Sequence, residues 1–263
     1  MSRSKTGCVR CSAVAVLTAL VVAGAATSAA AGGPPARVSA GGPLVTTMIV
    51  GPKGTLFGPT TVDAGATAVA VGGKRCRIDA GTPLAVLSAA LGARGPTFAL
   101  RDYGDCSSNP ADAGQLFVTT VGGFANRGAD GWEYKVDERS GSTGAADPSG
   151  AFGNGQLLRG GDRVLWFWCD TTASGDCQRT LVIGASPERV APGGRVTVTV
   201  SGDDNEGRGV DVRGAVVTLA GARATTNGHG QATLAAPRST GSFSISAQAA
   251  GLVPAFPQVI GVT

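Results

Sequence analysis

The sequence predicts a chain of two domains, an α+β domain with one short helix followed by an all-β sandwich. Short runs rich in β-branched and aromatic residues recur along the chain, which is typical of strands. Helical spacing of apolar residues stands out in one segment, residues 79–95. From residue 186 onward the strand-like runs follow one another at the regular spacing of a small β-sandwich. A single helix among strands favours the α+β class for the first domain.

Residues 1–31 have the composition of a secretory signal peptide. Arg3, Lys5 and Arg10 precede an uncharged run rich in Ala, Val and Leu. A membrane anchor is the alternative, but the strongly apolar part, residues 13–22, is shorter than the roughly 20 residues that a membrane span needs. We expect cleavage after Ala30 or Ala31, a secreted chain, and no membrane span after processing.

Processing would also change the charge of the chain. Removing Arg3, Lys5 and Arg10 from the 22 basic residues leaves 19 against 18 acidic residues, so the net charge falls from +4 to +1. No basic cluster remains that would bind nucleic acid or an anionic membrane. Arginine far outnumbers lysine, and alanine and glycine are abundant, which suggests a GC-rich bacterial genome.

Four cysteines remain after processing, and an even number in an oxidising compartment predicts two disulfides. The sequential pairing, Cys76 with Cys106 and Cys169 with Cys177, is preferred among three connectivities. A zinc site of four thiolates is the alternative, but the spacings do not resemble the close cysteine pairs of structural zinc sites. We therefore expect no metal at these residues.

The first domain is expected at residues 44–184, after a flexible leader rich in Gly, Pro and Ala at 32–43. Its helix should begin after Thr82 as the N-cap, with Pro83 in the first position, and end at Gly92. Residues 51–59 read as a loop or hairpin. Strands are expected at 44–50, 67–71, 74–78, 97–104, 115–123, 131–136, 163–169 and 179–185.

The second domain is expected at residues 185–263, after a proline-bounded linker. Val196, Val198 and Val200 alternate with threonines, which predicts a strand with one buried face. Residues 227–230, Asn-Gly-His-Gly, have turn chemistry because asparagine and glycine tolerate positive φ. Further strands are expected within 214–221, 224–237, 241–251 and 257–262.

Two segments of the first domain carry a family resemblance. They are GW-x-Y-x-V, at residues 131–136, and GD-x-V-x-W-x-W, at residues 161–168. In the sequence they come after the expected helix at 81–91 and the expected strand at 116–123. This order resembles the transcobalamin-like C-terminal domain, a β-grasp fold related to the SLBB group, over about residues 44–184. The chain departs from that family in a long Gly/Ser/Ala insertion after Glu138, and it lacks the α/α-barrel of a cobalamin carrier. The strand-turn-strand at 225–234 resembles a bacterial Ig-like domain of the invasin type, a class of spacers and adhesion modules.

The aromatic residues are the preferred ligand-binding candidates. Side chains two apart on a strand share a face, so Trp132 and Tyr134 point to one side of their strand, and Trp166 and Trp168 point to one side of theirs. If Phe167 faces the helix-covered core, Trp166 and Trp168 face outward and could bind a small molecule, a glycan or a protein partner. The alternative is that the aromatics pack beneath the insertion at 137–163.

The other polar groups offer little catalytic chemistry. His229 is the only histidine and is expected to be a solvated turn residue rather than a general base. Residues 203–206, Asp-Asp-Asn-Glu, read as a solvated loop, with a calcium site as the alternative. We expect no enzyme activity and no cofactor. The sequence favours a secreted binding protein, or alternatively a structural or adhesive surface protein whose Ig-like domain contacts a protein partner.

Overall fold

The computed structural model describes residues 41–92 and 96–263, all of which belong to one compact unit. The expected signal peptide and most of the leader lie outside the described residues. The two largest hydrophobic clusters of the unit are built from residues 45–168 and from residues 181–262. We call these parts the first and the second half.

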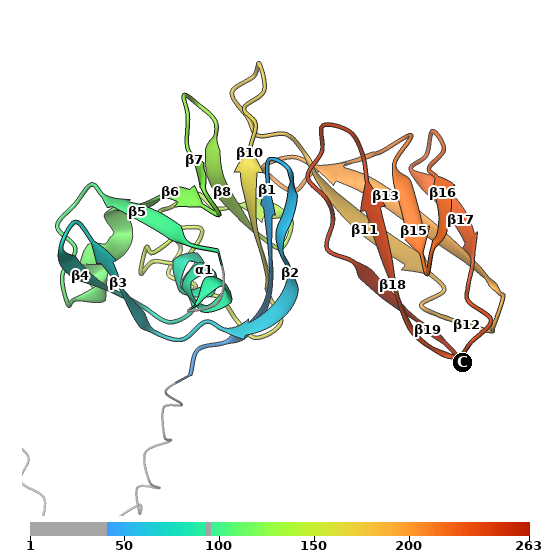
Figure 1. The fold of residues 1–263 in the computed structure, drawn as a ribbon, viewed down its shortest axis with the longest axis horizontal. Coiled ribbons are helices and arrows are strands. Elements are labelled where there is room, and N and C mark those ends of the chain that lie inside the picture. The colour runs from blue at the N-terminus through green and yellow to red at the C-terminus, as the bar shows by residue number, and fades with distance from the viewer. Residues whose placement is uncertain (1–40, 93–95) are drawn as a thin grey trace, which may run out of the picture. The chain divides into compact units, whose positions relative to one another are not determined.

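A mixed five-stranded sheet organises the first half, in the order β2-β1-β10-β8-β9 (Figure 1). β1 and β10 are parallel, whereas the other neighbours are antiparallel. The strands are β1 (Leu44–Gly51), β2 (Gly54–Asp63), β8 (Gly131–Val136), β9 (Arg139–Ser140) and β10 (Arg163–Cys169). The segment expected to be a loop or hairpin at 51–59 is a tight turn at Pro52 and Lys53 followed directly by β2, so the hairpin is right and the loop is wrong beyond residue 53.

The single α-helix, α1 (Pro83–Leu91), begins and ends as the sequence predicts. Thr82 is the N-cap, and its hydroxyl accepts a hydrogen bond from the Ala85 N–H at 3.3 Å. Gly92 closes the helix with φ 37°, and its N–H donates to the Ser88 carbonyl. Most of the helix is buried, including Leu84, Leu87 and Leu91, so it forms part of the core beside the sheet.

Two smaller sheets complete the first half. β3 (Thr67–Val71) and β4 (Lys74–Ile78) form a hairpin, and β5 (Phe98–Asp102), β6 (Leu116–Val121) and β7 (Phe124–Ala125) form a three-stranded sheet. A short 3₁₀ helix, η1 (Pro110–Gln115), precedes β6 and starts at Asn109, whose side chain accepts from the Ala111 N–H. The sequence reading identified β3 to β6 and missed η1 and β7.

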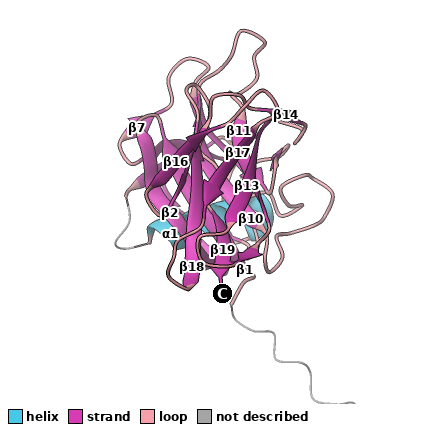
Figure 2. Ribbon diagram, turned by 90° about the vertical axis from the view of Figure 1, so that its right-hand side faces the viewer, coloured by secondary structure: helices cyan, strands magenta, loops and turns pink. Residues whose placement is uncertain are grey.

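The second half consists of two sheets that enclose its core. The first contains β13 (Arg195–Asp203), which pairs with β11 (Thr180–Ser186), β14 (Gly209–Asp211) and β17 (Gln231–Ala235). The second has the order β12-β19-β18-β15-β16. Its strands are β12 (Arg189–Val190), β15 (Val216–Leu219), β16 (Ala222–Thr225), β18 (Gly241–Gln248) and β19 (Gln258–Val262). Figure 2 labels β16, β18 and β19 of this sheet.

The strand at 179–185, expected in the first domain, belongs to the second half. β11 pairs with β13 over seven residues, from Thr180 opposite Asp203 to Ser186 opposite Thr197. Its composition suits either sheet, so its partner could not be read from the strand itself. β11 therefore pairs within the second half, although it precedes the proline-bounded segment near residue 185.

Candidate functional site

All four predicted ligand residues lie on one face of the antiparallel pair β8 and β10, and all four are buried. Trp132, Tyr134, Trp166 and Trp168 are 3%, 5%, 1% and 3% exposed. Trp166 is the cross-strand partner of Tyr134, and Trp168 is the partner of Trp132. The outward orientation of Trp166 and Trp168 was expected only if Phe167 faces the helix-covered core, and this condition is not met, because it is the Trp166 indole that lies against α1. The four residues form the aromatic part of the first core.

The helix and the insertion cover this face together. The Trp166 Nε1–H donates to the Pro83 carbonyl of α1 at 3.3 Å. The Tyr134 hydroxyl donates to the Thr143 carbonyl in the insertion at 3.0 Å. Ala145 links the two covers, because its carbonyl accepts from the Leu84 N–H of α1 at 2.8 Å. The alternative that the aromatics pack beneath the insertion therefore holds for Tyr134, whereas the Trp132 Nε1–H donates to the Phe124 carbonyl of β7 at 2.8 Å.

The four rings also pack against one another. The Trp132 and Trp168 rings meet edge to face, with centroids 5.9 Å apart and planes at 83°. The Tyr134 and Trp166 rings lie 5.4 Å apart. Such geometries add stability beyond the buried area. Burial is the main cause that raises the pKa of Tyr134 to about 12.

The opposite face of the same sheet is covered as well. Leu165, Phe167 and Cys169 of β10 point to this side and cluster with Met48 and Val50 of β1. Val253 and Phe256 of the second half pack against them. The sequence argument assumed that a sheet with one face in the core leaves the other in water. Here each face has its own cover, so Phe167 and Trp166 are both inaccessible.

Lys135 is the polar centre of this second face. It is 1% exposed, and its ammonium lies among oxygens of the second half. The Nζ donates to the Thr180 hydroxyl at 3.0 Å, the Asp203 carbonyl at 3.0 Å and the Asp204 carbonyl at 2.6 Å. Three donors therefore meet three acceptors, which satisfies the hydrogen-bonding capacity of the buried ammonium. Lys135 joins β8 to the start of β11 and the end of β13.

The surroundings of Lys135 lower the pKa of its ammonium group. Burial lowers its pKa to about 8. The carboxylates of Asp203, Asp204 and Glu206 oppose this effect, whereas the guanidinium of Arg179 adds to it. Desolvation is the largest of these influences. A lysine with a lowered pKa can be a nucleophile, but the oxygens that surround this one belong to carbonyls and a hydroxyl of the fold.

The acidic segment 203–206 is engaged in contacts within the protein. The Asp204 carboxylate accepts from the Arg208 N–H at 2.8 Å and from the Arg208 guanidinium at 3.1 Å. The Arg179 guanidinium lies 3.7 Å from the same carboxylate. The backbone hydrogen bond from Arg208 is the main cause that lowers the pKa of Asp204. Calcium ligands need carboxylate oxygens free to coordinate the ion, and those of Asp204 are already neutralised by arginine.

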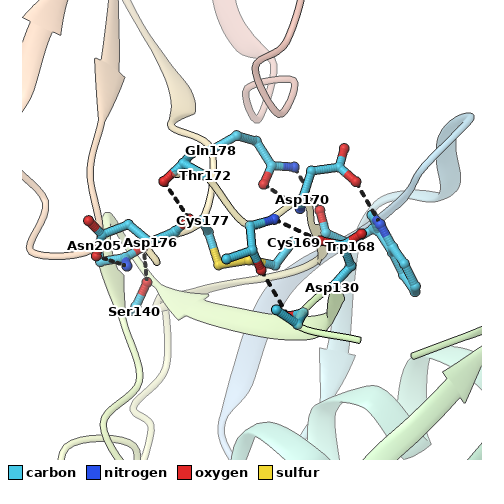
Figure 3. The surroundings of a disulfide bond; sticks show 12 residues. Asp130, Ser140, Trp168, Cys169, Asp170, Thr172, Asp176, Cys177, Gln178 and Asn205 are labelled. Carbon is cyan, nitrogen blue, oxygen red and sulfur yellow. Dashed lines mark hydrogen bonds between the residues drawn. A yellow bond between two sulfur atoms is a disulfide. The ribbon is translucent and has the colours of Figure 1, made fainter. Parts of the chain in front are cut away.

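Both predicted disulfides form, Cys76 with Cys106 and Cys169 with Cys177. The loop between Cys169 and Cys177 lies beside the junction with the second half (Figure 3). The Asn205 side chain donates to the Asp176 carboxylate at 3.3 Å and accepts from the Ser140 hydroxyl at 3.3 Å. The Asn205 carbonyl also accepts from the Ser140 N–H at 2.8 Å. This second set of contacts holds the segment after β13 against β9 and the disulfide loop.

A cleft of about 390 Å³ opens at the end of β10. Trp168 lines it, and its Nε1–H donates to the Asp170 carboxylate at 2.9 Å (Figure 3). The Gln178 side chain holds Trp168 and Asp170 in place, because it accepts from the Asp170 N–H at 2.8 Å and donates to the Trp168 carbonyl at 2.7 Å. Lys53 and the loop at 248–254 form other walls. The cleft thus offers one ammonium and one carboxylate to a small polar molecule.

His229 occupies the turn that the sequence predicts and is exposed. Its N–H donates to the Asn227 side chain at 2.9 Å, and the Gln231 N–H donates to the same oxygen at 3.0 Å. Its side chain makes no hydrogen bond or ion pair with another described residue. This places it as a turn residue.

The junction around Lys135, Thr180, Asp203 and Asn205 is the candidate functional site, because it is the polar centre of the contact between the two halves. Sequence reasoning missed it, and the signal available was a lysine inside a short aromatic strand. In the described part of the chain, no helix is long and apolar enough to cross a membrane. Comparisons with protein-family models and with curated proteins find no match to this chain.

Proposed function

We propose that this chain is a secreted, non-catalytic structural or adhesive protein whose two halves act as one rigid unit. The observation that carries the proposal is the cover on both faces of the β8–β10 pair. α1 and the insertion cover the aromatic face, and the second half covers the face that bears Phe167 and Lys135. A protein built to present aromatic rings to a ligand would leave one of these faces open.

The fold assignment that goes with this function is a transcobalamin-like β-grasp half followed by an Ig-like half of the invasin type. Supporting the first is the mixed sheet with β1 parallel to β10 at its centre and a helix packed on one face. Supporting the second are the two sheets that face one another across a core of alternating residues such as Val196, Val198 and Val200. In this assignment the Ig-like half contacts a protein partner.

Secretion is supported by the two disulfides, which persist in oxidising compartments, and by the composition of residues 1–31. We expect the intact mass of the chain recovered from culture medium to correspond to a start after Ala30 or Ala31 and to show no free thiol. Recovery only from the cytoplasm, with the first 31 residues retained, would contradict secretion.

A ligand screen separates the structural function from small-molecule binding. The purified mature chain is heated alone and with cobalamin, neutral oligosaccharides or calcium, and its melting temperature is measured. The structural proposal predicts the same melting temperature in every case, because the rings are already packed against protein and the Asp204 carboxylate is already paired with arginines.

A rise in melting temperature with cobalamin or an oligosaccharide would overturn the proposal. The variant Asp170→Asn then locates the ligand, since it removes the carboxylate charge of the cleft and keeps an acceptor for the Trp168 indole. Loss of the rise in this variant would place the ligand in the cleft.

A further inference from the structure

Strand β4 presents two arginines on one face of its hairpin. Arg75 and Arg77 are both exposed, whereas Cys76 and Ile78 between and beyond them are buried. Alternation along the strand therefore gives the two guanidinium groups a common side. The strand rises by 3.2–3.4 Å per residue, so their Cα atoms are separated by roughly 6.5–7 Å.

These arginines border a groove of about 530 Å³. On the neighbouring strand, Ala68 lies opposite Arg77 and Ala70 lies opposite Arg75. Alanine side chains are too short to cover the guanidinium groups, so the donors stay accessible. The groove is lined by Ala66, Thr67, Ala68, Arg75, Arg77 and Ser108. None of these is acidic, so the charged side chains of the lining are both positive.

Two carboxylates beside the hairpin, those of Asp102 and Asp105, are paired with Lys74. The Lys74 ammonium forms ion pairs with the Asp102 carboxylate at 3.2 Å and the Asp105 carboxylate at 2.9 Å. Neither Arg75 nor Arg77 forms an ion pair with any residue in the ranges 41–92 and 96–263. The two guanidinium groups are thus available to an external anion.

The groove is also held in place. The disulfide from Cys76 to Cys106 ties β4 to the segment that carries Ser108. The Arg77 N–H donates to the Ser107 carbonyl at 2.9 Å, which fixes that segment beside the strand. A ligand would therefore meet a surface that is already ordered, and the entropic cost of binding is smaller.

We propose that this groove binds an extended acidic peptide segment of a partner protein, with carboxylates on alternate residues facing Arg75 and Arg77. A guanidinium matches a carboxylate through two parallel hydrogen bonds. Side chains two apart on an extended peptide repeat at the same distance as Arg75 and Arg77, because both are strands. Sugar rings stack on aromatic side chains, and no aromatic residue lines the groove, so a peptide is favoured over an acidic glycan. This site lies in the first half and is independent of the proposed function.

Fluorescence anisotropy with labelled peptides tests the proposal on the full mature chain. The probe is an extended peptide with glutamates on alternate residues, and the comparison peptide places the same glutamates side by side. We expect tighter binding of the alternating peptide. In the double variant Arg75→Gln/Arg77→Gln its affinity should fall by roughly tenfold or more, as expected for the loss of charge-assisted hydrogen bonds.

The matched control is Arg195→Gln/Arg223→Gln, which removes the same charge from two exposed arginines of the second half. Its affinity for the alternating peptide should stay within about twofold of the wild type, since those charges lie outside the groove and act through screened solvent. All four substitutions are on exposed side chains, so circular dichroism should show unchanged folding.

Three results would overturn the proposal. The first is equal affinity of the groove variant and the wild type for the alternating peptide. The second is equal affinity of the wild type for the two peptides, because the spacing argument would then fail. The third is tighter binding of polygalacturonate than of the alternating peptide, with loss of that binding in the groove variant, which would assign the groove to an acidic glycan.

Discussion

The Lys135 ammonium donates a hydrogen bond to the carbonyl of Asp203, a residue 68 positions later in the chain, at 3.0 Å. The bond crosses from the sheet of the first half to the first sheet of the second half. A buried lysine with complete hydrogen bonding is costly to form and costly to disturb, since either partner left alone would be a buried polar group without compensation.

Replacing Lys135 with Met should therefore destabilise the whole chain. The substitution keeps much of the side-chain volume and leaves the carbonyls of Asp203 and Asp204 without their donor. We expect a loss of about 1–3 kcal/mol in the free energy of unfolding near neutral pH. Urea denaturation measures it. The control Lys53→Met changes an exposed lysine and should leave the free energy within about 0.5 kcal/mol of the wild type. An equal change in the free energy of unfolding in both variants would contradict the claim that the hydrogen bonds of Lys135 stabilise the contact between the two halves.

The pH dependence of stability should carry the signature of Lys135. Burial lowers its pKa from 10.5 to about 8. Between these values the folded chain has released a proton that the unfolded chain still holds, so the free energy of unfolding rises with pH. The difference between the wild type and Lys135→Met should thus grow from about pH 8 to about pH 10. Denaturation at a series of pH values checks this, and a constant or shrinking difference would contradict it.

Tyr134 has the opposite effect on the pH dependence of stability, because it makes the free energy of unfolding fall in alkaline solution. Its pKa is raised to about 12, so the unfolded chain loses the phenolic proton first and stability falls above about pH 10. Lys135→Met retains Tyr134, and the comparison of the two proteins therefore isolates the lysine.

Trp166→Ala should behave as a core substitution. The ring is 1% exposed and packs against Tyr134 and α1. We expect a loss of about 3–5 kcal/mol in the free energy of unfolding. Tyr103→Ala is the control, because that aromatic ring is 59% exposed and should cost much less. A loss below about 1 kcal/mol for Trp166→Ala would mean that the ring is not part of the core.

Gly141→Ala tests the contact between the insertion and the aromatic face. A Cβ at this position would lie only 2.1 Å from the Cζ atom of Tyr134, so ring and backbone would have to separate. We expect destabilisation of about 1–3 kcal/mol, the range for overpacking, together with a change in near-UV circular dichroism. Gly58→Ala is the control, since a Cβ there meets no atom within 4 Å. Equal melting temperatures of the two variants would contradict the packing.

Local features of this fold could be predicted because their causes are local. Thr82, Pro83 and Gly92 bound the helix through their own hydrogen bonds and φ values. The preferred one of three cysteine pairings, the sequential one, is also confirmed. What covers a sheet face is not a local property. The alternation predicts correctly that Trp166 and Phe167 point to opposite faces of the sheet. The Phe167 face, however, is covered by Val253, which lies far along the chain.

The same reasoning explains why Lys135 and β11 were missed as parts of the junction. A lysine in a strand normally points to water, and only the register of β8 beside β10, together with the position of Asp203, buries this one. β11 has the composition of either half, and its place is set by seven pairings with β13. The burial of Lys135 depends on contacts between distant segments, whereas β11 and β13 are close in sequence, with Ser186 opposite Thr197.

Hydrogen exchange of the native chain, measured by mass spectrometry at increasing denaturant, tests the central claim that the two halves form one unit. Peptides from β10 in the first half and from β18 in the second half are compared. If the halves unfold together, the slowest amides of both strands exchange through the same opening, with the same free energy and the same dependence on denaturant. Exchange of β18 at a clearly lower free energy than β10, or the reverse, would show that the halves open independently and would contradict the account.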